Sequence, residues 1–242
     1  MLDLKNLSKL KEHRNFRVIS EIIIVGLIYI FGQISVSILL KGFSVDSEQE
    51  LLSRPGVLTS AYIVGGTAIL LALAVILKLT KTKLSELKLG RPKLKDIGYG
   101  FLGFGAYFII VRILLALIVL VFPSFNADQA QNIGLQNASS NLLPIIFFAL
   151  AVVPPISEEL LFRGYLYNKL IKNKISVLTS ALIVSVIFGA LHGQWNVAID
   201  TFTLSMVMIY VLQLRPSLWA TITMHFLKNS LAFLVLFIFR IG

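Results

Sequence analysis

Residues 142–168 read LLPIIFFALAVVPPISEELLFRGYLYN, a run that is almost entirely apolar until it reaches two glutamates and an arginine. A membrane-spanning helix needs about 20 consecutive, mainly apolar residues, and this run is long enough. A charged side chain at the centre of a bilayer costs on the order of 3 kcal/mol on insertion scales. Glu158, Glu159 and Arg163 are therefore candidates for a functional site.

Similar apolar runs recur along the whole chain. Of its 242 residues, 57% are hydrophobic and only 14% are charged, whereas about 25% of the residues in a typical soluble domain are charged. The sequence therefore predicts an all-α, polytopic helical membrane bundle that forms a single integral-membrane domain over residues 1–242. Seven membrane-spanning helices are expected, with eight as the alternative, at residues 18–40, 57–79, 97–122, 142–168, 176–192, 196–213 and 216–239.

Lysine and arginine gather in alternate connecting segments. Residues 1–17 carry five of them and residues 78–95 carry seven, whereas residues 123–141 carry none. Basic segments of membrane proteins stay on the cytoplasmic side. We therefore expect a cytoplasmic N-terminus in a multi-pass protein, with the plasma membrane as its location. This topology also accounts for the net charge of +10, so the expected partner is the lipid bilayer and not a nucleic acid.

Two further features limit the chemistry. Gly98, Gly100 and Gly103 form a GxGxxG pattern, but a dinucleotide site needs a preceding strand and an acidic residue about 20 positions later. We expect neither here, so we predict no nucleotide partner and interpret these glycines as contacts between packed helices. The chain has no cysteine, which excludes disulfides, thiol nucleophiles and thiolate metal sites.

The two adjacent glutamates should differ in their surroundings. Pro154 and Pro155 interrupt the fourth span, and we expect the helix to restart with Ser157 or a neighbour as its cap. Glu159 and Arg163 are then four residues apart on one face, which favours an ion pair. Glu158 points about 100° away from that pair and is free to face another group.

Other polar residues should reach the same depth. If the fourth and fifth spans form a hairpin that turns near residues 172–174, Glu158 and His192 both lie roughly 22–27 Å from the turn. His225 and Asn229 are four residues apart on one face of the last span and reach a similar level. Irregular backbone at such depth lines a cavity or is covered by protein, so the sequence predicts a hydrated pocket. Further ionisable groups within the spans are Arg112, Asp200 and Lys228.

These residue types match a hydrolase that acts on a carbonyl group. A buried carboxylate beside a histidine can hold and deprotonate a water molecule, which gives this role to Glu158 and His192. His225 and Asn229 can donate hydrogen bonds to an oxyanion. The alternative is a zinc ion held by Glu158, His192 and His225. We favour the site without a metal or other cofactor, because a histidine with an amide four residues later is typical of a donor pair.

Three motifs within residues 154–229, which form the core of the site, resemble one family. Residues 158–163 read EELLFR and resemble the EExxxR motif of the CAAX-protease and bacteriocin-processing (CPBP, or Abi) intramembrane proteases. Residues 188–192 read FGALH and resemble the FxxxH motif, and residues 225–229 read HFLKN and resemble the HxxxN motif. The order of the motifs and their placement on helices also agree.

The resemblance implies an intramembrane endopeptidase, of the glutamate or the metallo type, with a peptide or pre-peptide substrate at the membrane, such as a bacteriocin leader. It assigns water activation to Glu158 and His192 and oxyanion stabilisation to His225 and Asn229. Glu159 and Arg163 match supporting positions of the family.

Two other classes of function remain as alternatives. The first is a non-catalytic membrane protein, such as a bacteriocin self-immunity factor or a scaffold. The second is a small transporter with a polar relay inside the membrane. A transporter of this kind is expected to contain an internal repeat, and the sequence contains none that we recognise.

Overall fold

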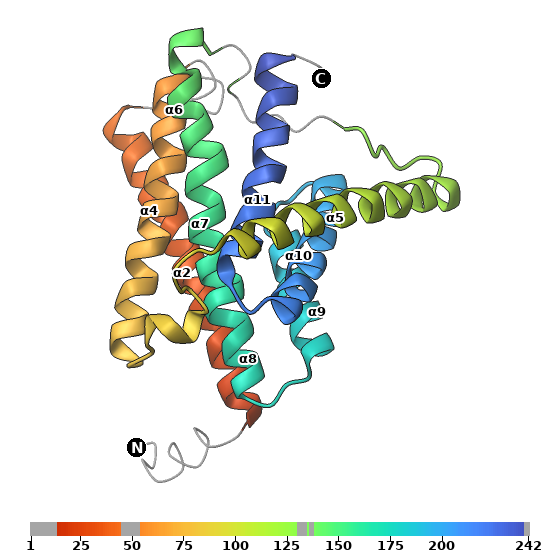
Figure 1. Ribbon diagram of the computed structural model, residues 1–242. Helices are drawn as coiled ribbons and strands as arrows, with labels where there is room; N and C mark the ends of the chain where they lie inside the picture. The colour runs from red at the N-terminus through yellow and green to blue at the C-terminus, as the bar shows by residue number, and fades with distance from the viewer. Residues whose placement is uncertain (1–13, 45–53, 130–134, 136–137, 240–242) are drawn as a thin grey trace.

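The computed structural model describes residues 14–44, 54–129, 135 and 138–239. This part of the chain is helical and contains no strand, as the sequence predicts (Figure 1). Its long helices are α2 (Arg14–Gly42), α4 (Pro55–Leu79), α5 (Leu94–Val121), α10 (Trp195–Leu214) and α11 (Leu218–Phe233), which continues as the π-helix η5 (Leu234–Ile238). Short 3-10 helices lie at Leu84–Leu87 (η1) and Ser140–Leu142 (η2).

Six helical segments of the described chain are long and apolar enough to cross a membrane. They coincide with six of the seven expected spans. The exception is the fifth expected span, 176–192, which holds the shorter helix α9 (Val177–Ala190) of 14 residues. The chain turns directly after α9, and apolarity alone could not reveal where the helix ends.

The fourth span runs over Ser140–Lys172 and is built from several pieces. They are α6 (Leu143–Phe147), the π-helix η3 (Phe148–Val152), α7 (Val153–Glu159), the π-helix η4 (Leu160–Tyr167) and α8 (Asn168–Lys172). Pro154 and Pro155 occupy the first turn of α7, where the missing proline N–H groups are tolerated. The predicted cap at Ser157 is wrong, because helix α7 already begins at Val153 and the Ser157 hydroxyl donates to the Val153 carbonyl at 3.0 Å. The chain stays helical through the prolines because the wider π-helical turn precedes them.

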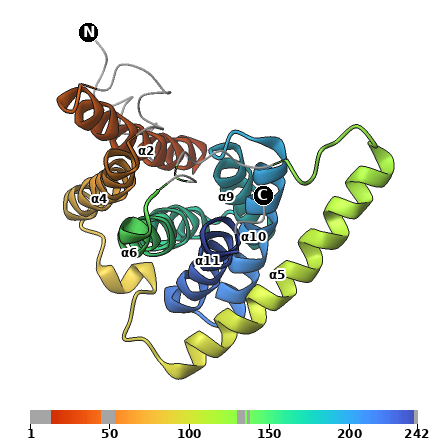
Figure 2. The same ribbon diagram turned by 90° about the horizontal axis from the view of Figure 1, so that it is seen from above.

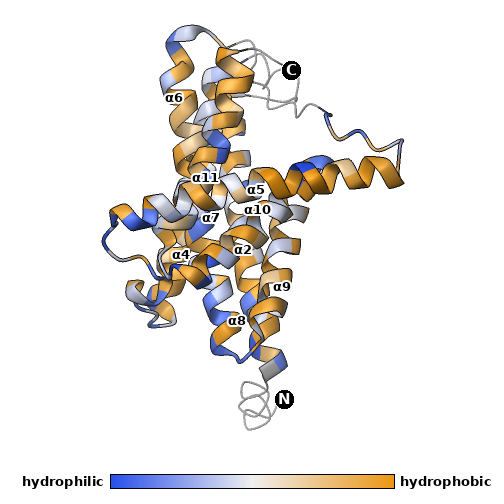
Figure 3. Cartoon of the chain, turned by 45° about the vertical axis from the view of Figure 1, so that its right-hand side comes forward, coloured by the Kyte–Doolittle hydropathy of each residue, from blue (hydrophilic) through white to orange (hydrophobic). Residues whose placement is uncertain are grey.

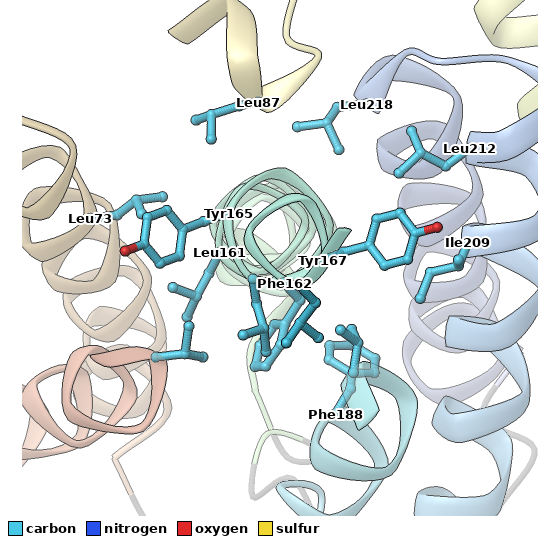
Figure 4. Close-up of a cluster of buried hydrophobic side chains, with 14 of the residues drawn as sticks. Leu73, Leu87, Leu161, Phe162, Tyr165, Tyr167, Phe188, Ile209, Leu212 and Leu218 are labelled. Atoms are coloured by element: carbon cyan, nitrogen blue, oxygen red, sulfur yellow. The ribbon is translucent and has the colours of Figure 1, made fainter. Parts of the chain in front are cut away.

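The fourth span forms the centre of the bundle. Its side chains at 161–167 are fully or almost fully buried, and helices from both halves of the chain surround them (Figure 4). The surrounding residues include Leu73, Leu87, Phe188, Ile209, Leu212 and Leu218. Because the two glutamates lie one turn before this packed segment, their helix has a fixed position in the bundle.

Helix α5 lies across the direction of the other long helices (Figures 1 and 2). It packs on α10 and α11, and most of its residues are hydrophobic (Figure 3). Several of its large apolar side chains, such as Leu102, Ile109 and Leu120, are exposed. A Cβ atom on Gly100 would lie 2.6 Å from Cβ of Thr223, and one on Gly103 would lie 2.6 Å from Sδ of Met224. These two glycines therefore allow the close approach of α5 to α11, as expected from the sequence. The expectation is wrong for Gly98, where no atom lies within 4 Å of an added Cβ.

The described basic residues at the start of α2, after α4 and at the end of α8 lie at one end of the bundle. Figure 1 shows the start of α2 and the end of α8 at this end, while α6 begins and η5 ends at the opposite end. The connection after α4 is fixed there by Glu86, which forms an ion pair with Lys172. The hydrogen bond from Lys172 keeps the pKa of the Glu86 carboxyl below its usual value.

Candidate active site

A cavity of about 420 Å³ lies between α2 and α4 on one side and α7 and α11 on the other. Its wall contains Glu158, His192, His225 and Asn229. The structure thus brings together the four side chains for which the sequence predicts catalytic roles. They come from α7, from the turn after α9, and from α11, as the depth argument requires.

The two adjacent glutamates have different surroundings. The side chain of Glu159 is fully buried, and its Oε1 atom accepts a hydrogen bond from Nη1 of Arg163 at 2.8 Å. Glu158 faces the cavity, and its side chain is 20% exposed. The ion pair expected from the spacing of Glu159 and Arg163 is therefore present, and Glu158 is the carboxylate that a substrate can reach.

His225 lies between both glutamates. Its Nδ1 atom is 3.0 Å from Oε1 of Glu159, and its Nε2 atom is 3.9 Å from Oε2 of Glu158. An ionised carboxylate only accepts hydrogen bonds, so the proton of this contact is on Nδ1. Glu159 thereby orients the ring and leaves Nε2 toward Glu158. Sequence reasoning gave Glu159 only Arg163 as a partner and missed this contact, because 66 residues separate it from His225.

Phe188 is a site residue that the sequence analysis identified only as the first letter of a motif. Its ring meets the rings of His192 and His225 edge to face, with centroids 5.0 and 5.9 Å apart. The guanidinium carbon of Arg163 lies 4.3 Å from the centre of the same ring. Phe188 therefore packs against both histidines and against the cation that pairs with Glu159.

His192 lies directly after the last turn of α9. Its Nδ1 atom is 2.8 Å from the carbonyl oxygen of Phe188. Because a carbonyl only accepts, Nδ1 carries a proton and Nε2 is free for the cavity. Nδ2 of Asn196, at the start of α10, donates to the carbonyls of Ala127 and Gln129 at 3.1 and 2.9 Å. These bonds connect the turn to the segment after α5, although Gly193 and Trp195 are exposed.

Asn229 supplies a hydrogen bond that the two prolines cannot donate. The carbonyl of Leu150 would accept from the N–H of residue 154 in an α-helix, or of residue 155 in a π-helix, and both residues are proline. Nδ2 of Asn229 donates to this carbonyl at 2.9 Å. An amide NH₂ group has two N–H donors, so one of them remains for a ligand.

Asp200 and Lys228, two further charged residues within the spans, lie close together. The hydroxyl of Tyr107 donates to Asp200, and Nζ of Lys228 lies 3.5 Å from the second oxygen of the same carboxylate. Lys228 also lines the cavity. Arg112 is not among the cavity-lining residues, and its guanidinium stacks on the ring of Phe108 at 5.4 Å.

The hydrogen bonds of His192 and His225 are compatible with metal binding and with catalysis by protein groups alone. Metal-binding histidines donate their second ring N–H to a carbonyl or a carboxylate, which His192 and His225 both do. Across the described residues, no group of three His, Cys, Asp or Glu side chains is placed so that it could hold a metal ion. We therefore derive the reaction from protein groups alone.

Comparisons with known proteins agree with the motifs. Residues 140–231 match the model of the Rce1-like family, whose description is type II CAAX prenyl endopeptidase Rce1-like. This segment contains all three motifs and every residue for which we predict a catalytic or supporting role. No curated protein and no solved structure matches the chain. The segment that contains the site therefore matches the Rce1-like family model, which confirms the resemblance to the CAAX-protease and bacteriocin-processing proteases.

Proposed function

We propose that the protein is an intramembrane endopeptidase that hydrolyses a membrane-proximal peptide or pre-peptide with a water molecule activated by Glu158. The observation that supports this most is the meeting of one accessible carboxylate, two imidazoles and one amide in a single cavity wall. The family match supports a CAAX-type endopeptidase of the membrane in general. The division of roles among the residues is our own inference.

The first step needs a base that the substrate can reach. Glu158 is the accessible member of the glutamate pair, and Nε2 of His192 is free to accept a hydrogen bond from the same water. As the water oxygen attacks the peptide carbonyl carbon, its proton passes to the Glu158 carboxylate. When the C–N bond breaks, Glu158 gives this proton to the leaving amine and returns to the carboxylate form.

The second requirement is a donor for the negative charge that develops on the peptide oxygen. Asn229 has one N–H that its bond to Leu150 does not use. His225 can donate through Nε2 only when both ring nitrogens carry protons, and the carboxylates of Glu158 and Glu159 supply negative charge on either side of that form. Preorganised donors of this kind stabilise a tetrahedral intermediate.

The shape of the cavity is consistent with an apolar substrate. From the level of Glu158 and His225, the cavity continues along α11 past Ala232 and along η5 to Phe237. Leu58 and Tyr62 of α4 form part of the opposite wall. Apolar side chains next to the cleaved bond, or an isoprenoid of the kind named in the family description, would lie against these walls.

The test is cleavage by purified full-length protein in lipid vesicles. The substrates are quenched fluorescent peptides with membrane-proximal sequences, each with and without an isoprenylated cysteine, and products are identified by mass spectrometry. We expect cleavage by the wild type and by Glu86→Gln, a matched change of a glutamate at the basic end, but not by Glu158→Gln. If no peptide is cleaved, or if Glu158→Gln cleaves as fast as the wild type, the non-catalytic alternative replaces our proposal.

A further inference from the structure

Lys228 lies in the wall of the same cavity, and the proposed hydrolysis does not use its charge. It is on α11 between His225 and Asn229, and its side chain is 21% exposed. Among the described residues that line the cavity, it is the only lysine or arginine. Charged residues within membrane spans are expensive and usually mark a substrate path or pair with another charge. Lys228 lines the cavity and also pairs with Asp200. The strength of this pairing decides whether Lys228 can bind a ligand.

The pairing with Asp200 leaves Lys228 with unused N–H donors. The distance of 3.5 Å between Nζ and Oδ2 is longer than a normal N–H···O hydrogen bond. The other oxygen of Asp200 accepts from the Tyr107 hydroxyl. An ammonium group has three N–H donors, and one carboxylate oxygen at this distance occupies at most one of them. Asp200 thus holds the ammonium group at the cavity and leaves N–H donors of this group for a ligand.

The position of Lys228 relates it to the reacting groups. It lines the same cavity as His192, and it directly precedes Asn229 in the chain. Arg163 is already paired with the buried Glu159 and does not line the cavity, so it is not available as a counter-charge for a ligand there. A negatively charged group of a bound substrate would therefore find its counter-charge at Lys228, beside the site of hydrolysis.

We propose that Lys228 is a specificity-determining residue that binds a carboxylate of the peptide substrate and so places the scissile bond at Glu158 and His192. This inference rests on the proposed peptidase function. The carboxylate is either the free C-terminus of the peptide or the side chain of an acidic residue, and both form the same charge-assisted hydrogen bond with an ammonium.

Binding tests this proposal independently of cleavage. The probe is a fluorescein-labelled apolar decapeptide in three forms: a free C-terminal acid, a neutral C-terminal amide, and an amide with one internal glutamate. Affinities are measured by anisotropy with full-length Glu158→Gln protein in lipid vesicles, so that no probe is consumed. We expect at least one carboxylate form to bind about tenfold more tightly than the neutral amide. The form that does so identifies the source of the carboxylate.

Three further variants in the same background separate recognition from structure. Lys228→Gln should remove the preference for the carboxylate. Tyr107→Phe removes the other partner of Asp200 without changing the cavity wall, so it should lower the melting temperature and keep the preference. Asp200→Asn frees the ammonium and should keep or increase the preference.

Equal affinities of the three probes for the parent protein would overturn the proposal, as would a loss of preference in Tyr107→Phe equal to that in Lys228→Gln. Failure of the wild type to cleave peptides, with the carboxylate preference intact, would instead contradict the proposed function alone.

Discussion

Nδ1 of His225 lies 3.0 Å from Oε1 of Glu159, the same oxygen that accepts from Arg163. One buried carboxylate therefore joins the arginine of its own helix to the histidine of the last helix. From this fully buried position, Glu159 holds the ring of His225 in place. The two adjacent glutamates thus differ in their contacts. Glu158 is open to the cavity, whereas Glu159 binds Arg163 and His225.

The role of Asn229 as an oxyanion donor is tested by Asn229→Asp. The new carboxylate has the same shape but cannot donate to an oxyanion, so we expect kcat to fall by about 100-fold or more. The loss of the bond to Leu150 should also lower the melting temperature. Asn168→Asp is the matched control, because Nδ2 of Asn168 donates to a helix carbonyl, that of Gly164, at 2.8 Å outside the cavity. A similar loss of kcat in the control would show that instability, and not a missing donor, explains the effect.

The contact of α5 with α11 predicts a difference between two glycines of one helix. In Gly100→Ala the new methyl group would lie 2.6 Å from Cβ of Thr223, whereas at Gly98 no atom lies within 4 Å of the added Cβ. Overpacking costs about 1–3 kcal/mol, and each kcal/mol lowers Tm by about 2–4 °C in a chain of this size. Thermal unfolding in detergent should therefore show a lower Tm for Gly100→Ala and no change for Gly98→Ala. Equal shifts would contradict the packing that we describe.

Local spacing made some features of the site predictable from the sequence. The pair Glu159–Arg163 follows from one helical turn, and the convergence of Glu158 with His192 follows from counting residues along a hairpin. Contacts between distant segments were not predictable in this way. The bond of Asn229 to Leu150 links residues 79 positions apart, although two consecutive prolines do indicate that a carbonyl one turn earlier lacks its donor.

The fold shows the same limit. Apolar length predicted the long helices, but it could not predict that α9 ends at Ala190 or that α5 lies across the bundle. Both depend on packing, since α5 is placed by close contacts at Gly100 and Gly103. The expected cap at Ser157 failed for a related reason, because the π-helical turn before Pro154 allowed the helix to continue.

The orientation in the membrane is tested by two single serine-to-cysteine changes. Ser85 and Ser140 are both exposed, and they lie on the short helices η1 and η2, at the basic end and the opposite end of the bundle. The chain has no cysteine of its own, so a thiol reagent reports only the introduced residue. With the N-terminus inside, an impermeant maleimide added to intact cells should label Ser140→Cys and not Ser85→Cys. The reverse labelling would mean that the topology is inverted.

Our proposal of a metal-free reaction predicts that active, detergent-purified protein contains well below one zinc ion per chain. Elemental analysis measures this content, and cleavage should continue after treatment with EDTA. One zinc ion per chain, with activity that is lost to the chelator and regained on addition of zinc, would contradict the proposal. Glu158, His192 and His225 would then become the candidate ligands.

The central claim, that Glu158 is the base and Glu159 its support, is tested most directly by measuring kcat and Tm for Glu158→Gln and Glu159→Gln side by side. We predict that Glu158→Gln lowers kcat by at least about 100-fold, because an amide cannot accept the proton of water, and leaves Tm unchanged. Glu159→Gln should lower Tm strongly, since stranding the buried Arg163 costs about 3–5 kcal/mol, while the surviving folded protein retains measurable cleavage. The opposite pattern, with turnover retained in Glu158→Gln and abolished in a fully stable Glu159→Gln, would contradict the account.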